Sequence, residues 1–203
     1  INFLILLTVM KKIIKKIIPS FFQKFIKNIL ENLEKKKFKN MTNKQIFGEI
    51  YKKKLWSSDE AKGKFKYYSG TGSHNEEFTK IYINKIKEFL QLLPTKPDVV
   101  DLGCGDFEIG HKIRKYCANY VAVDVFEDLI LHNKKKYHDF NVIFETIDIT
   151  QDELPKGEVC FLRTVLQHLS NESIIRFLKL MKNKYKYLVI TEHLPENPNF
   201  IQI

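Results

Sequence analysis

Residues 99–105 read Val-Val-Asp-Leu-Gly-Cys-Gly, which is a short apolar run, a carboxylate and two glycines. We expect a buried strand that ends near Asp101 and then a tight turn, because glycine lets the backbone turn sharply and lets a ligand approach closely. Open α/β sheets bind their ligands at the carboxyl ends of the strands, where Asp101 would lie. A dinucleotide-binding turn would carry a third glycine where Glu108 stands, and the next glycine is Gly110.

Two further strand ends carry an acid. Residues 120–124 read Tyr-Val-Ala-Val-Asp and predict a strand that ends at Asp124, roughly 20 residues after the glycines. An acid at this place can accept hydrogen bonds from both ribose hydroxyls of an adenosine. Residues 141–146 predict a third strand, and Asp148 follows it. The three acids together favour a nucleoside-sized ligand; on the glycines alone, a structural turn in another doubly wound fold remains an alternative.

The rest of the chain alternates between strand and helix patterns. Two more apolar strands are predicted at 159–162 and 187–190, and helices are predicted at 76–93, 107–118, 126–136 and 174–181. Continuous apolar strands separated by helices favour a parallel sheet covered on both faces. We therefore predict an α/β, Rossmann-like doubly wound and mostly parallel sheet in the order 3-2-1-4-5, with its switch point at the glycine turn.

The spacing Asp101-x-Gly103-x-Gly105, followed by Gly110, resembles motif I of the class I S-adenosylmethionine methyltransferases, and the resemblance covers roughly residues 65–195. It implies S-adenosylmethionine as the cofactor, with Asp148 taking the exocyclic amine of adenine and the next backbone N–H reading the ring. Members of this family normally add a sixth strand and an antiparallel seventh, which we expect to be missing here. The residues expected to bind the cofactor are Asp101, Gly103, Cys104, Gly105, Asp124, Val125, Asp148, Ile149 and Arg163.

Methyl transfer requires mainly that the two reactants are aligned, and an oxygen acceptor gains from a nearby base. Candidates for that base follow the fourth and fifth strands: His168, Glu192 and His193, with His74 a further histidine to consider. Histidine titrates near neutral pH and suits this role. As an alternative, His168 is a helix-entry residue that the backbone satisfies.

The N-terminal extension at residues 1–40 holds ten lysines and two glutamates, and so carries eight of the ten net positive charges of the chain. Within it, residues 11–30 place isoleucine and phenylalanine pairs at helical spacing with lysines on the opposite face. Such a basic amphipathic helix suits an anionic membrane surface. As an alternative, the apolar stripe docks on the protein's own domain or on a second subunit.

We expect residues 41–95 to form a helical and loop lead-in with a lid, and residues 96–203 to form the cofactor-binding core, truncated at its C-terminus. The lid would be residues 67–74, where glycines and hydroxyls stand beside aromatics; a surface turn is the alternative. This segment is similar to one found in methyltransferases of bacterial surface-polysaccharide gene clusters. That resemblance implies a saccharide or lipid-linked saccharide acceptor.

Other classes of site find little support. The six histidines show no metal-ligand spacing, so we predict no metal. The fourth strand is not followed by the Asn/Asp-Pro-Pro-aromatic motif, which disfavours methylation of a nucleobase amine. Residues 41–203 carry a net charge of only +2, so nothing there indicates a nucleic-acid surface. Three cysteines without a disulfide framework suit a reducing cytoplasm. We therefore expect a cytoplasmic protein, whose basic helix would give it peripheral contact with the inner face of the membrane.

The sequence thus predicts an S-adenosylmethionine-dependent methyltransferase that acts on a small-molecule or saccharide acceptor, on oxygen. Two alternatives belong to other classes. One is an NAD-dependent oxidoreductase on the same fold, which Glu108 and Asp148 disfavour. The other is a non-catalytic or truncated module that associates with membranes through its basic helix.

Overall fold

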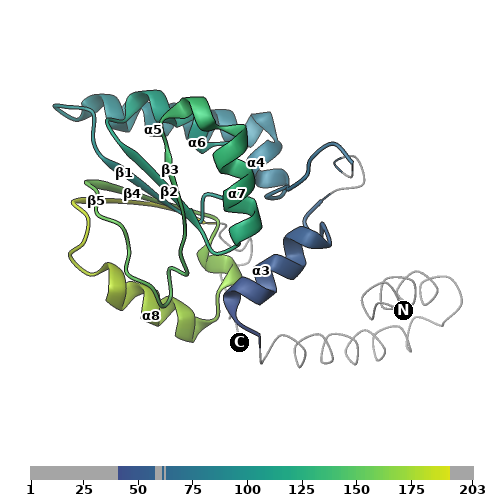
Figure 1. Ribbon diagram of the computed structural model, residues 1–203. Coiled ribbons are helices and arrows are strands. Elements are labelled where there is room, and N and C mark those ends of the chain that lie inside the picture. The colour runs from purple at the N-terminus through teal and green to yellow at the C-terminus, as the bar shows by residue number, and fades with distance from the viewer. Residues whose placement is uncertain (1–40, 58–60, 62, 193–203) are drawn as a thin grey trace, which may run out of the picture. The chain divides into compact units, whose positions relative to one another are not determined.

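The computed structural model describes residues 41–57, 61 and 63–192 (Figure 1). The chain divides into two compact units, residues 1–46 and 47–203. The described part of the first unit, residues 41–46, contains the beginning of helix α3 (Asn43–Lys52). The amphipathic helix predicted within residues 1–40 and the candidate base His193 lie outside the described residues. No helix in the described part of the chain has the length and apolar character needed to cross a bilayer.

The second unit is built on a sheet of five parallel strands in the order β3-β2-β1-β4-β5. This order confirms the predicted fold class. It places the switch point at β1, because the chain adds β2 and β3 on one side of β1 and then crosses over to add β4 and β5 on the other. The strands are β1 (Val99–Leu102), β2 (Tyr120–Asp124), β3 (Ile143–Thr146), β4 (Val159–Arg163) and β5 (Tyr187–Thr191).

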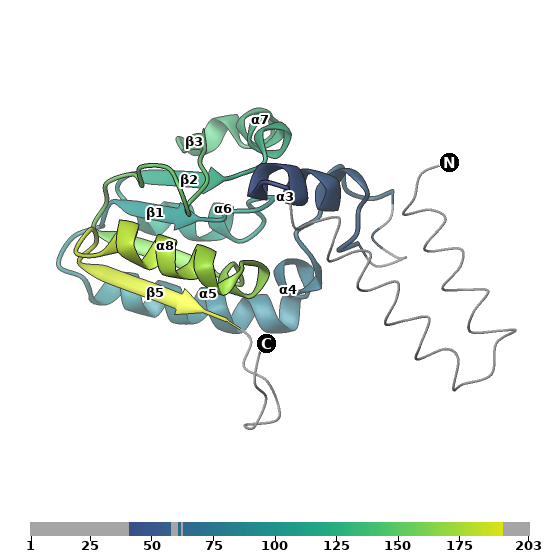
Figure 2. The same cartoon turned by 90° about the horizontal axis from the view of Figure 1, so that it is seen from below.

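Helices cover both faces of the sheet (Figures 1 and 2). Three lie on one face: α5 (Glu76–Leu92), α6 (Gly110–Ile113) and α7 (Glu127–Lys136). The other face carries α8 (Asn171–Met181), which runs in front of the sheet in Figure 2, while β5 forms the edge of the described sheet. The remaining short elements are α4 (Thr71–His74), η1 (Arg114–Tyr116), η2 (His138–Phe140) and η3 (Leu166–His168).

The central strand β1 is buried on both faces because its side chains alternate between two apolar cores. Val99 packs on the side of α5 with Ile86 and Leu90. Val100 and Leu102 point to the opposite face, where they join the core that contains Phe177 of α8. Because both faces of β1 are buried, residues that point to either face are apolar, and the sequence of β1 is an almost continuous apolar run.

Helix beginnings follow the capping chemistry of the sequence. The side chain of Asn75 accepts hydrogen bonds from the backbone N–H groups of Glu77 and Phe78 at the start of α5. The side chain of Ser170 accepts one from Ser173 at the start of α8. These bonds satisfy donors that have no partner within the helix.

The helix predicted at 107–118 is wrong in its extent. Phe107 has a left-handed backbone (φ +60°), so a helix cannot begin there, and the α-helical part is limited to α6. The side chain of Phe107 is fully buried and its ring packs edge-on against Tyr120, Tyr137 and Phe144. Burial of this ring compensates for a backbone conformation that a non-glycine residue rarely adopts.

Candidate functional site

The glycine turn after β1 has the conformation that its sequence indicates. Gly103 (φ +77°) and Gly105 (φ +56°) both lie in the left-handed region. The N–H groups of Gly103 and Cys104 each donate to the carbonyl of Val123 at 2.9 Å, which joins the turn to the end of β2. Because these bonds fix the turn at the carboxyl edge of the sheet, the turn lies where open α/β sheets bind their ligands.

Neither glycine could carry a side chain without a clash. A Cβ atom on Gly103 would lie 2.5 Å from Cγ2 of Val165, and one on Gly105 would lie 2.3 Å from Oγ of Ser69. Val165 comes from the loop after β4, and Ser69 from the segment that precedes α4. The turn is therefore enclosed from two sides by segments that are distant in sequence.

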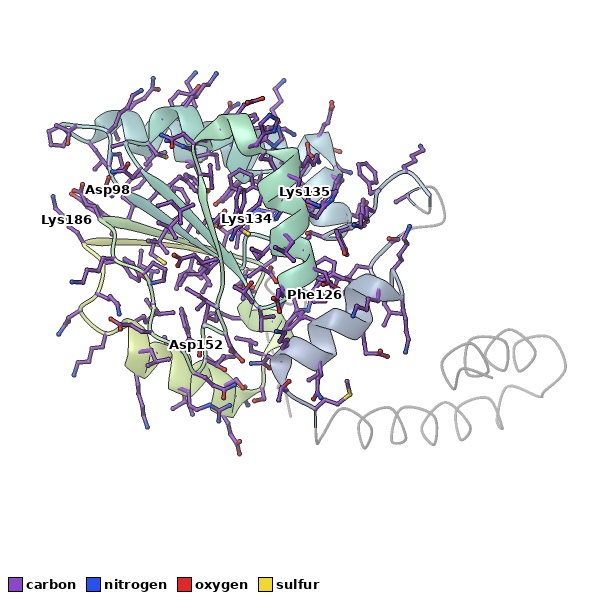
Figure 3. The ribbon with its side chains drawn as sticks, viewed as in Figure 1. Asp98, Phe126, Lys134, Lys135, Asp152 and Lys186 are labelled. Carbon is purple, nitrogen blue, oxygen red and sulfur yellow. The ribbon has the colours of Figure 1, made fainter. Side chains whose placement is uncertain are left out.

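Asp124 at the end of β2 is buried, and its carboxylate binds the backbone of the glycine turn. Its Oδ2 atom accepts a hydrogen bond from the N–H of Gly105 at 3.2 Å, and its Oδ1 atom accepts one from Phe126 at 3.1 Å. Burial raises the pKa of Asp124 to about 6, and the backbone N–H groups oppose part of that rise. Figure 3 shows Phe126 at this carboxyl edge, while Asp98 and Lys186 lie at the opposite edge of the sheet.

Asp101 at the end of β1 is a second acid with little access to water. Its Oδ2 atom accepts a hydrogen bond from the hydroxyl of Tyr120 at 2.9 Å. Burial raises the pKa of Asp101 to about 6 even though Tyr120 and the charge of Arg163 lower it, and the charge of Asp124 raises it further. Two carboxylates that influence each other thus share one edge of the sheet, an arrangement typical of functional sites.

Asp106 directly follows the glycine turn and is buried, and it was not among the predicted site residues. Its Oδ2 atom accepts a hydrogen bond from the N–H of Ser69 at 3.0 Å and lies 2.6 Å from Nε2 of His74. The N–H of Asp106 in turn donates to Oγ of Ser69 at 2.7 Å. Burial raises the pKa of Asp106, but the contact with His74 and the backbone N–H groups outweighs burial, so the net pKa is lowered.

These bonds place residues 67–74 against the glycine turn, which argues against a free surface turn. Arg163 at the end of β4 adds a second attachment, because its Nη2 atom donates to the carbonyl of Gly72 at 2.7 Å and to Oγ of Ser73 at 3.3 Å. The guanidinium of Arg163 also lies over the ring of Tyr82, 5.3 Å from its centre. Closure of this segment over a ligand stays a prediction.

Tyr51 encloses the same site from a third side. Its hydroxyl lies 3.2 Å from Oγ of Ser69, and its ring stacks on Phe126 with centroids 5.7 Å apart. Tyr51 is buried, and nothing in its local sequence marks it as part of a site. Its role is visible only once the fold brings α3 and the end of β2 together.

The third predicted acid, Asp148, stabilises its own turn. Its Oδ1 atom accepts hydrogen bonds from the N–H and the hydroxyl of Thr150, and its Oδ2 atom accepts one from the amide of Gln151. The N–H of Ile147 donates to the carbonyl of Asp124 at 3.1 Å, so this turn adjoins the end of β2. Its contact with a ligand, like those of Val125 and Ile149, stays a prediction.

The candidate bases occupy different surroundings. The exposed ring of His168 lies 4.9 Å from that of Trp56 and 6.4 Å from that of Phe47. Glu192 binds the backbone of the loop after β4, since its Oε1 atom accepts from Val165 and Leu166 at 2.8 Å each. His74 contacts the carboxylate of Asp106 beside the glycine turn.

Cys104 stands between the two glycines of the turn. Burial raises the pKa of the Cys104 thiol well above its usual range, so this side chain remains a neutral thiol at pH 7. Within residues 41–57, 61 and 63–192, no three side chains of histidine, cysteine, aspartate or glutamate are grouped so that they could hold a metal ion.

The raised pKa of Asp101 predicts a pH-dependent stability. Between about pH 4 and pH 6 the folded chain holds a proton that the unfolded chain has released, so this contribution to stability is full below about pH 4 and is lost as the pH rises through 6. We expect Asp101→Asn to gain stability relative to the wild type as the pH rises from 4 to 7, by up to about 3 kcal/mol. Urea unfolding at several pH values measures this difference, and a difference independent of pH would contradict it.

No protein-family model matches the chain, and no curated protein matches it. Among solved structures, magnesium protoporphyrin IX methyltransferase (ChlM) from Synechocystis PCC 6803, which contains bound S-adenosylmethionine, is similar with a TM-score of 0.56 and 14% identity. The similarity covers 74% of this chain and 76% of that one.

Two further methyltransferase structures are similar at TM-scores below 0.5. The methyltransferase domain of bacterial CtHen1-CN matches with a TM-score of 0.47 and 15% identity, over 57% of this chain and 65% of that one. The N-methyltransferase NodS from Bradyrhizobium japonicum WM9, in complex with S-adenosylhomocysteine, matches with a TM-score of 0.48 and 15% identity, over 55% and 60%. This chain therefore spans less than two thirds of the length of either.

The similarity to the Synechocystis enzyme and the strand order 3-2-1-4-5 both agree with the fold that the glycine motif predicts. The chain has the Rossmann-like fold of the S-adenosylmethionine-dependent methyltransferases.

Proposed function

We propose that this chain binds S-adenosylmethionine at the carboxyl edge of its sheet and transfers the methyl group to a small-molecule acceptor. One observation carries the proposal: the buried carboxylate of Asp124 and the partly buried one of Asp101 flank a glycine turn whose two left-handed residues have no room for a side chain. A ligand with hydroxyl donors and a positive charge suits such carboxylates, because their burial has deprived them of water.

The residues fit this cofactor. Each oxygen of Asp124 accepts one backbone N–H, and each retains a lone pair for a ribose hydroxyl. Asp101 provides negative charge on the neighbouring strand, which favours a cationic ligand. Asp148 and the N–H of Ile149 are the proposed contacts to adenine, because their turn adjoins the end of β2. Bound here, S-adenosylmethionine supplies an electrophilic methyl group on a positively charged sulfur.

Transfer to oxygen, with a saccharide as the acceptor, is the finer form of the proposal and rests on the resemblance of residues 67–74. An oxygen acceptor needs a group that takes its proton. Of the candidate histidines, His74 is the better supported, because Asp106 holds its Nε2 atom and leaves Nδ1 as the other ring nitrogen. A carboxylate that accepts the N–H of a histidine fixes its tautomer and its orientation.

Competition between nucleotides tests the proposed function. We expect the wild-type chain to bind S-adenosylhomocysteine in calorimetric titration, and we expect NAD to leave that affinity unchanged even at a large excess. The reason is that Glu108 occupies the place of the third glycine, while Asp124 remains available to the ribose. Displacement by NAD would instead favour the oxidoreductase, and no binding of either compound by a folded chain would favour a non-catalytic module.

A further inference from the structure

Glu192, the first residue after β5, binds the backbone of the loop that follows β4. Its Oε1 atom accepts hydrogen bonds from the N–H groups of Val165 and Leu166, each at 2.8 Å. Both N–H groups stand at the start of the 3-10 turn η3, where backbone donors have no partner within the turn. Hydrogen bonds to a carboxylate are about twice as strong as bonds between neutral groups. One side chain thus determines the course of a loop 26 residues earlier in the chain.

The loop that Glu192 binds is strained. Thr164 has a left-handed backbone (φ +52°), although it is a β-branched residue. Such a conformation costs on the order of 1–3 kcal/mol and persists only where the surroundings hold it. The N–H of Thr164 donates to the carbonyl of Thr191 at 2.7 Å, which adds a third bond to the two that Glu192 forms with this loop. The strained residue is therefore held from the same strand end that carries Glu192.

The same loop forms one wall of the glycine turn. A Cβ atom on Gly103 would lie 2.5 Å from Cγ2 and 3.3 Å from Cγ1 of Val165, so the side chain of Val165 lies directly against Gly103. Val165 is also one of the two residues whose N–H groups Glu192 binds. A continuous series of contacts runs from the end of β5, through Glu192 and Val165, to the first glycine of the turn.

The other oxygen of Glu192 is buried. Its Oε2 atom has no hydrogen-bond partner in the described part of the chain. Among the described residues, the N–H groups of Val165 and Leu166 are thus the donors that compensate this carboxylate. A buried carboxylate with two donors on one oxygen holds those donors strongly, since losing either would leave its charge less compensated.

We infer that Glu192 is a positioning residue: it holds Val165 against Gly103 and so determines the wall of the cofactor site on the side of β4. The inference deepens the proposed function and rests on it for the effect on cofactor affinity. Glu192 was predicted as a candidate base from its position after a strand, whereas its observed contacts are with the backbone of a loop.

The test compares Glu192→Ala with Glu192→Gln by two readouts, hydrogen exchange of the Val165 and Leu166 amides and affinity for S-adenosylhomocysteine. In Glu192→Ala we expect exchange of both amides at least about tenfold faster and affinity at least about tenfold weaker. Glu192→Gln should stay within about threefold of the wild type in both, because its amide oxygen can accept the same two bonds. Glu172→Ala, an exposed acid on α8, is the matched control and should change neither readout.

Unchanged exchange in Glu192→Ala would overturn the inference. It would also be overturned if Glu192→Gln kept the protection of both amides but lost affinity, because the charge would then act on the ligand itself. If Glu192→Ala does not fold, Glu192→Asp replaces it and should expose the same two amides by shortening the side chain. A wild-type chain that binds no S-adenosylhomocysteine would contradict the proposed function, and the exchange data would still decide whether Glu192 holds the loop.

Discussion

Gly110→Ala is expected to lower the free energy of unfolding by about 3 kcal/mol, the upper end of the range for overpacked cores. A Cβ atom at this position would lie 2.1 Å from Cε2 and 2.5 Å from Cδ2 of Phe107. The ring of Phe107 cannot move aside, because it is fully buried and packs against Tyr120, Tyr137 and Phe144 with centroids 4.9–5.5 Å apart. Urea unfolding followed by circular dichroism measures the change.

Gly72→Ala is the matched control for this substitution. No atom lies within 4 Å of a Cβ built on Gly72, and its backbone is outside the left-handed region. We expect its unfolding free energy to stay within about 0.5 kcal/mol of the wild type. Equal unfolding midpoints for Gly110→Ala and Gly72→Ala would contradict the claim that Phe107 leaves no room for a side chain at position 110.

Asp124→Ala is expected to weaken binding of S-adenosylhomocysteine at least about 100-fold. The proposed contacts are two ribose hydroxyls on one buried carboxylate, and each hydrogen bond to a charged group contributes about 1.5–3 kcal/mol. Calorimetric titration of both proteins at pH 7.5 measures the ratio of affinities. At this pH the wild-type carboxylate is ionised, because burial raises its pKa only to about 6.

Asp128→Ala serves as the control, since Asp128 lies near Asp124 in sequence but is half exposed and forms an ion pair with Lys52 on the surface. Its affinity for S-adenosylhomocysteine should equal that of the wild type. An Asp124→Ala protein that folds normally and binds S-adenosylhomocysteine with undiminished affinity would contradict the proposed contact between Asp124 and the ribose.

The sheet could be predicted because its determinants are local in sequence. The apolar runs of β1, β2 and β4 are almost continuous, since these inner strands are buried on both faces. The run of β5 is apolar as well, although Leu188 and Ile190 are exposed at the edge of the described sheet. The two glycines mark a turn that no other residue type could form here, because a Cβ would strike Val165 or Ser69. Strand order then follows from the position of this turn at the switch point of the sheet.

What the sequence did not reveal depends on contacts between distant residues. Phe107 takes a left-handed backbone because its ring is buried among three aromatic residues, and this tertiary packing overrides the local helix pattern. The hydrogen bonds between Asp106 and Ser69 join residues 37 positions apart. Asp106 follows the glycines and Ser69 belongs to a Gly/Ser-rich segment, but nothing in a single sequence indicates that these two residues contact each other.

The candidate bases illustrate the same limit. Position after a strand places His168 and Glu192 at the correct edge of the sheet, but it does not say what each side chain contacts. His168 packs on Trp56, and Glu192 holds the loop after β4. His74, which has the weakest sequence signal of the candidates, is the histidine that contacts a carboxylate beside the glycine turn.

An amide-resolved magnetic resonance titration of the wild-type chain with S-adenosylhomocysteine tests whether the cofactor binds at this edge of the sheet. We expect the largest shifts on the N–H groups of residues 103–106, on those following Asp124, and on the turn at 147–150. These three stretches follow the carboxyl ends of β1, β2 and β3. Saturable shifts confined to other parts of the chain, or no shifts at millimolar ligand, would contradict the assignment of this edge as the cofactor site.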